Sequence, residues 1–159
     1  MRTFRLAGID HAPFEPLFRL SDDELSARQA VRVRANAQPG YPCRVSLCDA
    51  EVGEELLLLP YEHQPARSPY RAGGPIYVRR DATRRILEPG EMPTYVTRRM
   101  ISVRAYDSAD LMIDAQVCDG RDVADVLHGL LENRAVAYLH LHNAARGCFS
   151  CVAYPVARG

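Results

Sequence analysis

The residues best suited to chemistry gather near the C-terminus, where His140, His142 and Asn143 are followed after a short turn by Cys148. A thiol beside an imidazole and an amide has the composition of a Cys–His–Asn nucleophilic site, in which a base activates the thiol. In such a site Cys148 would be the nucleophile, and His140 or His142 would be the base. We therefore consider His142, Asn143 and Cys148 as candidate catalytic residues.

Two other interpretations of this segment stay open. His140, His142, Cys148 and Cys151 are residue types that bind Zn²⁺. On an extended strand, however, the two cysteines face opposite sides of the sheet, and the Phe-Ser pair between them does not favour the tight turn that such a site needs. Alternatively, the thiols are small core side chains and the histidines bond to loop carbonyls. We expect no bound metal and no cofactor.

Clustered arginines supply a second group of candidates. The segment from Arg71 to Arg104 holds eight arginines against three acidic residues. Guanidinium groups bind phosphate and carboxylate through paired hydrogen bonds, and binding residues are common in loops and at strand ends. A solvated face balanced by neighbouring aspartates would have the same composition. The candidate ligand-binding residues are Arg44, Tyr70, Arg71, Arg104 and Tyr106.

Arginine content by itself is weaker support than this clustering. All twenty basic residues are arginine, and lysine is missing from the whole chain rather than from one segment. Such a chain-wide bias fits a GC-rich coding sequence. Arg44 and Asp49 flank a short apolar segment, and we expect them to form a buried ion pair or to cap the turn at Gly53.

A sheet must position these side chains, and hydrophobic periodicity indicates its strands. The pattern predicts about seven or eight short strands, among them 3–8, 31–34, 43–47, 55–61, 101–106, 111–118, 135–142 and 148–156. Pro60 places its strand at an edge or ends it. Helices are predicted over 22–29, where Ser21 and Glu24 form a capping box, over 93–99, and over 122–132, where apolar residues recur at helical spacing.

The short turns between successive strands favour antiparallel pairing. We therefore predict a single α+β domain over 1–159, with one mainly antiparallel, curved sheet and two or three helices. Twenty acidic residues balance the twenty basic ones, which argues against nucleic-acid binding. No apolar run approaches 18 residues and no secretory signal is evident, so we expect a cytoplasmic protein that does not bind a membrane. Its five cysteines lack framework-like spacing, which favours reduced thiols.

Four stretches together resemble the bacterial domain-of-unknown-function family numbered 1203. They are GYPCRVSLCDAEVGEELLLLPYEHQ (40–64), SPYRAGGPIYVR (68–79), RRMISVRAYD (98–107) and HNAARGC (142–148). The resemblance extends from Phe4 to about Tyr154 and implies a small bacterial protein, but it implies no activity and no catalytic residue. Cys48 and Cys151 lie outside the family motif, which further weakens the metal interpretation.

These observations lead to one functional hypothesis and two alternatives. We expect a pocket lined by Arg44, Arg71, Arg104 and Tyr106 to bind a small anionic ligand, with His142 and its neighbours beside it. The first alternative is a hydrolase or transferase in which Cys148 is the nucleophile. The second is a structural or protein-interaction module without catalysis. The sequence is compatible with a homodimer and does not fix the oligomeric state.

Overall fold

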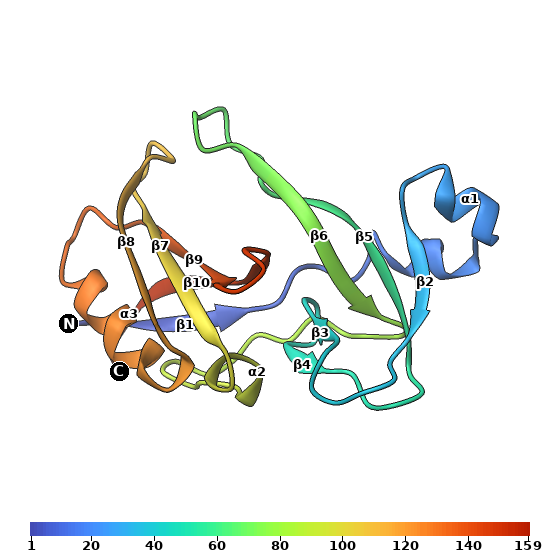
Figure 1. Cartoon of the computed structure of the whole chain (residues 1–159). Helices are drawn as coiled ribbons and strands as arrows, with labels where there is room; N and C mark the ends of the chain where they lie inside the picture. The colour runs from blue at the N-terminus through green and yellow to red at the C-terminus, as the bar shows by residue number, and fades with distance from the viewer.

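The computed structural model describes all residues from 1 to 159, and its ten strands form two five-stranded sheets (Figure 1). The strand order is β1-β10-β9-β7-β8 in the first sheet and β2-β5-β6-β3-β4 in the second. The strands are Arg2–Ala7 (β1), Val31–Arg34 (β2), Pro42–Cys43 (β3), Cys48–Asp49 (β4), Glu55–Gln64 (β5), Ala72–Arg79 (β6), Met100–Tyr106 (β7), Met112–Asp119 (β8), Tyr138–Asn143 (β9) and Phe149–Ala157 (β10).

This architecture confirms the α+β class and the mainly antiparallel pairing, but the prediction of one sheet with seven or eight strands is wrong. All pairings are antiparallel except the contact between β3 and β6. Periodicity identifies which segments are extended. It carries no information on which distant segments pair, so it could not divide the strands between two sheets.

Three α-helices accompany the sheets: Asp22–Ser26 (α1), Thr94–Thr97 (α2) and Val123–Leu131 (α3), with 3₁₀ turns at Glu15–Arg19 and Gly120–Asp122. The predicted capping box of α1 is present, with the Ser21 hydroxyl accepting from the Glu24 amide at 3.1 Å. The apolar stripe of α3 packs on one face of the first sheet, against β1, β7 and β8. Because of strand alternation, the opposite face carries Tyr138, His140 and His142.

The predicted strand over 43–47 is wrong in an informative way. Strand β3 ends at Cys43, and the chain then turns through residues 44–47 before β4 begins at Cys48. Leu47 has φ of 52°, in the left-handed region, and its amide bonds to the Cys43 carbonyl at 3.0 Å. All four residues of this turn are buried, and apolar Val45 and Leu47 alternate with polar Arg44 and Ser46, so its sequence pattern is the same as that of a strand.

Strand β5 extends beyond the predicted range and is internal to the second sheet. Its pairing with β2 covers only Glu55 to Leu58, whereas its pairing with β6 continues to Gln64. Pro60 therefore lies past the end of β2, where the missing proline N–H breaks no ladder on that side. The edge position predicted from Pro60 is therefore correct locally, because β5 has no β2 neighbour beyond Leu58 although the strand is otherwise internal to the sheet.

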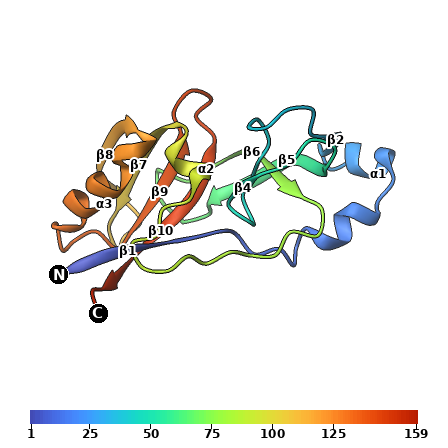
Figure 2. The same ribbon diagram turned by 90° about the horizontal axis from the view of Figure 1, so that it is seen from below.

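The two sheets lie side by side rather than face to face (Figures 1 and 2). Each sheet has its own hydrophobic core, and the two cores exchange side chains. Leu47, from the turn between β3 and β4 of the second sheet, packs in the core of the first sheet, and Phe149 of β10 packs in the core of the second. The β5–β6 loop reaches the β7–β8 turn, where the Ser68 hydroxyl donates to the Asp110 carbonyl at 2.8 Å. None of the helices has the length and apolar character that a membrane crossing requires.

Candidate functional site

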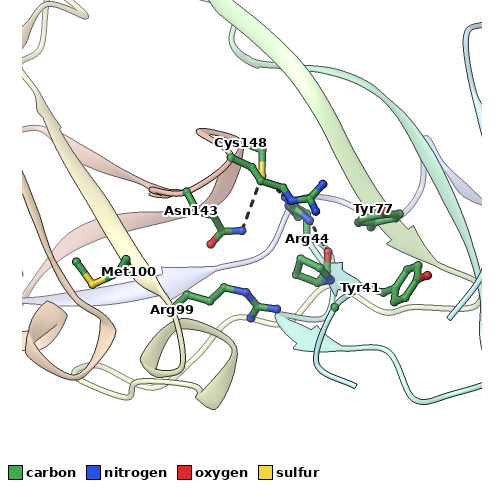
Figure 3. A pocket seen from close by; sticks show the side chains of 11 residues that line it. Tyr41, Arg44, Tyr77, Arg99, Met100, Asn143 and Cys148 are labelled. Atoms are coloured by element: carbon green, nitrogen blue, oxygen red, sulfur yellow. Dashed lines mark hydrogen bonds between the residues drawn. The ribbon is translucent and has the colours of Figure 1, made fainter. Parts of the chain in front are cut away.

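A cleft of about 540 Å³ lies where the two sheets meet (Figure 3). Three structural segments form it: the turn leading into and out of β3, the middle of β6, and the start of β7 with the β9–β10 hairpin. Its volume falls in the range of small-molecule sites. The lining residues are Gly40, Tyr41, Pro42, Arg44, Tyr77, Arg99, Met100, Asn143, Ala145, Arg146 and Cys148.

Arg44 has its guanidinium fixed in this cleft and is only 1% exposed. Its Nε donates to the Phe149 carbonyl at 2.8 Å, Nη1 to the Pro42 carbonyl at 2.6 Å, and Nη2 to the Cys148 sulfur at 3.1 Å. The predicted ion pair with Asp49 is wrong. The turn directs Arg44 toward the β9–β10 hairpin, so this buried cation is solvated by neutral acceptors and its charge is not neutralised.

Asp49 instead binds two arginines from the segment between α2 and β7. The carboxylate is 3% exposed and accepts from Arg99 Nη1 at 3.1 Å and from Arg98 Nη1 at 3.4 Å, and Arg99 Nη2 makes a further ion pair with it. Asp49 belongs to β4 of the second sheet, and both arginines precede β7 of the first. The network therefore joins the two sheets at one wall of the cleft.

Cys148 and Asn143 come from the same hairpin and face the cleft together (Figure 3). The Asn143 side-chain amide lies 3.9 Å from the Cys148 sulfur, and Asn143 Oδ1 is buried without a hydrogen-bond partner. His142 precedes Asn143 on β9, so its ring points to the other face of the sheet. Its Nδ1 bonds to the Gly147 carbonyl at 3.0 Å, and no hydrogen bond joins His142 to Cys148.

The candidate site residues did not include Tyr41, Tyr77, Arg99 and Arg146, which also line the cleft, although Arg99 and Arg146 lie in the two segments that supplied the candidates. Tyr41 and Tyr77 form an aromatic wall with ring centroids 5.3 Å apart and an interplanar angle of 57°. The signal that could have found them is proximity in the chain: Tyr41 precedes Arg44 by three residues, and Arg146 lies inside the turn before Cys148. Arg99 belongs to the arginine-rich segment from Arg71 to Arg104, whereas Tyr77 carries no such signal, because only the pairing of the distant strands β3 and β6 brings it here.

A second polar group, which we call the imidazole cluster, lies on the other face of β9. It consists of His63 from β5, His140 and His142 from β9, and Arg104 from β7. The His63 ring centroid is 4.9 Å from that of His142 and 6.0 Å from that of His140. Phe149 stacks parallel to His63 at 5.3 Å, so the cluster bridges both sheets.

The histidines of the cluster are held in the neutral form. Burial is the main cause, and it lowers the pKa of His140 to about 3 and that of His142 to about 4. The pKa of His63 is also lowered, first by burial and then by the positive charge of Arg104. The charge of Arg104, which is paired in register with His140, also lowers the pKa of His140 and His142.

The candidate ligand-binding residues are thus divided among three places and do not line one pocket. Arg44 lines the cleft, whereas Arg104 belongs to the imidazole cluster and is paired in register with His140. Tyr70 meets Tyr106 edge-on at 6.1 Å, next to that cluster. Arg71 lies at the start of β6 and pairs with Glu62 at 3.1 Å, with both side chains about half exposed.

The structure shows no group of three or more His, Cys, Asp or Glu side chains arranged to hold a metal ion. Cys151 is fully buried in the first core, where burial raises its thiol pKa to about 12. It is therefore separated from Cys148, which faces the cleft. The edge strand β8 carries large exposed apolar side chains, including Ile113 and Val117. These side chains do not test the alternative of a protein-interaction module, which stays a prediction.

A family model described as a protein of unknown function (DUF1203) matches residues 40–154. The match begins later than the expected start at Phe4 and includes every residue that lines the cleft, together with the whole imidazole cluster. Searches among curated proteins and among solved structures found no match.

Proposed function

The chain belongs to the DUF1203 family, whose description assigns no function, and from the geometry of the inter-sheet cleft we propose that the protein binds a small anionic molecule there. The observation that carries this proposal is the buried guanidinium of Arg44, which has three neutral acceptors and no carboxylate. A buried cation left without a counter-ion raises the positive potential of the adjacent cavity.

The other charges of the cleft have the same sign. Arg146 is exposed at its rim and takes part in none of the ion pairs. Arg99 also lines the cleft, although its charge is shared with Asp49. Three guanidinium groups therefore meet one carboxylate, which leaves an excess of positive charge. A ligand carboxylate or phosphate entering from the rim would meet Arg146 first.

The rest of the lining favours a ligand with an aromatic or apolar part. Tyr41 and Tyr77 supply ring surfaces across the cleft from the polar hairpin, and Met100 supplies a thioether on the same side as Asn143 (Figure 3). Asn143 Oδ1 is buried and unpartnered, so it can accept a hydrogen bond from a ligand hydroxyl or amine. The ligand class that fits is therefore a small aromatic or apolar acid carrying one hydrogen-bond donor.

Isothermal titration with 4-hydroxybenzoate and phenyl phosphate tests this proposal, with neutral benzyl alcohol as the comparison ligand. We expect the acids to bind, and we expect Arg146→Gln to weaken them at least fivefold by removing one rim charge. Arg28→Gln makes the same change of charge at an exposed site on the other side of the second sheet and should stay within twofold. The proposal fails if neither acid binds, or if both variants have the same effect.

One contact favours a second function, nucleophilic chemistry at Cys148. Its sulfur accepts from Arg44 Nη2 at 3.1 Å inside the cleft, and a neighbouring guanidinium stabilises a thiolate relative to a thiol. The activating group would then be Arg44 rather than His142. Labelling with iodoacetamide at pH 7 should modify Cys148 faster than Cys118, which lies beside two aspartates. Equal rates at both cysteines would rule out this second function.

A further inference from the structure

The imidazole cluster contains buried polar atoms that the proposed function does not use. His142 is 1% exposed and its Nε2 has no hydrogen-bond partner; His140 is 6% exposed and its Nδ1 has none. Unpartnered buried polar atoms are uncommon in folded proteins, because each one costs free energy of desolvation that no bond recovers. Two such atoms on neighbouring residues of one strand face indicate a position that a ligand would complete.

Arg104 gives this position its charge. Its guanidinium donates a long hydrogen bond from Nε to the Ser102 hydroxyl at 3.4 Å, lies beside the neutral hydroxyl of Tyr106, and makes no ion pair. It is half-buried, unlike the solvent-exposed arginines that need no partner. Asp110 is the one acidic side chain that lines the adjoining hollow, where it accepts a hydrogen bond from the Tyr138 hydroxyl at 2.7 Å and forms no ion pair with Arg104. The fixed charge of the cluster is therefore positive, which favours an anion and disfavours a metal cation.

The tautomer of His142 adds a requirement for a proton. Its Nδ1 faces the Gly147 carbonyl, so Nδ1 carries the hydrogen, and in the neutral ring Nε2 is an acceptor. An anion can contact Nε2 favourably only if the ring takes up a second proton or the ligand brings one. Binding of an anion should therefore be accompanied by proton uptake.

Access to the cluster is available from one side. A hollow of about 340 Å³ borders the cluster and is lined by His63, His140, Tyr138 and Asp110 together with residues 64–66 and residues of β10. Arg104 and His142 lie behind this lining, and a ligand reaches them past the rings of His63 and His140. This hollow is distinct from the cleft, with which it shares no lining residue. An oxyanion could reach the rings from here without passing Cys148.

We propose that Arg104 and the rings of His63, His140 and His142 form a second site, which binds a small oxyanion together with a proton. Arg104 provides the ion pair, and protonated Nε2 of His142 donates a charge-assisted hydrogen bond. The charged and titratable groups facing His142 are His63 from β5, Arg104 from β7, His140 from β9, and Arg44 from the turn after β3, while Tyr106 from β7 faces His140. Apart from the tyrosine, these groups are cationic or become cationic on protonation, so a bound anion offsets the repulsion that keeps the rings neutral.

Sulfate is the probe that tests this site, because its charge does not change between pH 5.5 and 7.5. We expect sulfate to perturb the imidazole ¹⁵N resonances of His140 and His142 and to bind at least tenfold more tightly at pH 5.5. Arg104→Gln should weaken binding at pH 5.5 at least tenfold, and Arg104→Lys should recover part of it. The matched control is Arg67→Gln, an exposed residue of the β5–β6 loop, which should stay within twofold.

The cleft can be separated from this site with Arg146→Gln. Retention of sulfate binding in Arg146→Gln and its loss in Arg104→Gln supports the second site, whether or not aromatic acids bind in the cleft. The opposite pattern means that sulfate occupies the cleft, and it overturns the second site while leaving the proposed function intact. Equal affinity at the two pH values, or no shift of the two histidine resonances, also overturns it.

Discussion

At the scale of single residues, Arg44 and His142 have the same energetic problem, since each is a basic side chain that is 1% exposed. A guanidinium cannot lose its proton in a protein, so Arg44 stays charged and is held by three acceptors, the nearby Pro42 carbonyl and two atoms of the distant β9–β10 hairpin. An imidazole can lose its proton, so His142 is buried neutral, with a pKa of about 4. The cleft therefore carries a fixed charge, whereas the imidazole cluster carries a charge that depends on pH.

This difference predicts an acid-sensitive fold. Between pH 6.5 and about 4 the unfolded chain protonates His142 and the folded chain does not, so the unfolded state binds more protons and stability falls as the pH falls. At pH 5 the loss from this one residue should be about 2 kcal/mol relative to pH 7.5. His142→Gln should flatten the profile of unfolding free energy over this range, measured by urea denaturation. Arg67→Gln should follow the wild-type profile, and parallel profiles for His142→Gln and wild type would contradict the prediction.

The site residues could be predicted from the sequence only as far as local geometry extends. Asn143 and Cys148 lie five residues apart on one hairpin, and their common orientation follows from that hairpin. The opposite orientation of His142 also follows from strand alternation, which argues against pairing it with Cys148. The partner of Cys148 is Arg44, 104 positions away. No local pattern encodes that contact, because it depends on how the two sheets meet.

At the scale of elements, the features that the sequence predicted well are those with a local physical cause. The capping box of α1 and the apolar stripe of α3 depend on residues within one or two turns. The β7–β8 hairpin depends on a turn between two alternating segments. The prediction of a strand over 43–47 failed because apolar and polar residues also alternate in this fully buried turn, and the left-handed φ of Leu47 left no compositional signal.

Gly8, just after β1, lies against the turn that carries Arg44, and its substitution should show how closely this turn packs on the end of β1. A Cβ at this position would lie 2.0 Å from the Val45 carbonyl oxygen and 3.0 Å from that of Arg44. The obstructing atoms are backbone, so Gly8→Ala must displace the turn that holds Arg44. We expect a loss of at least about 2 kcal/mol in unfolding free energy, with weaker binding of phenyl phosphate.

The control for Gly8→Ala has the opposite expected sign. Gly129 lies within α3 and has no atom within 4 Å of an added Cβ. Gly129→Ala should therefore stabilise the protein by about 1 kcal/mol, because alanine has the higher helix propensity. Urea denaturation of both variants measures the difference. If Gly8→Ala is as stable as wild type, the turn is not tightly held against β1.

At the scale of the whole molecule, the two sheets are joined at both ends of their shared boundary. The Ser68–Asp110 and Gln64–Tyr138 hydrogen bonds close the end near the imidazole cluster, and the Asp49–Arg99 network closes the end at the cleft. Between these ends the interlocked side chains of Leu47 and Phe149 tie the cores together. A ligand bound in the cleft would contact both sheets, so its affinity depends on the contacts that hold the two sheets together.

Substitution of Asp49 measures how far ligand affinity depends on the contacts between the two sheets. Asp49→Asn keeps the shape of the side chain but removes the charge that Arg98 and Arg99 share, and it leaves Arg99, whose side chain is 18% exposed, without a counter-ion. Breaking a buried pair in this way typically costs about 3–5 kcal/mol of stability. Glu62→Gln breaks the half-exposed pair with Arg71 and should cost less than about 1 kcal/mol.

The same substitution should have the opposite effect on ligand binding. Once Asp49 is neutral, the full charge of Arg99 is available to the cleft, so the affinity for phenyl phosphate should rise severalfold while the unfolding free energy falls. Urea denaturation and isothermal titration on the same preparations measure the two quantities. A fall in both would mean that the cleft depends on the bridge between the sheets more than on its charge. A loss of stability no greater than that of Glu62→Gln would show that the Asp49 network does not hold the sheets together.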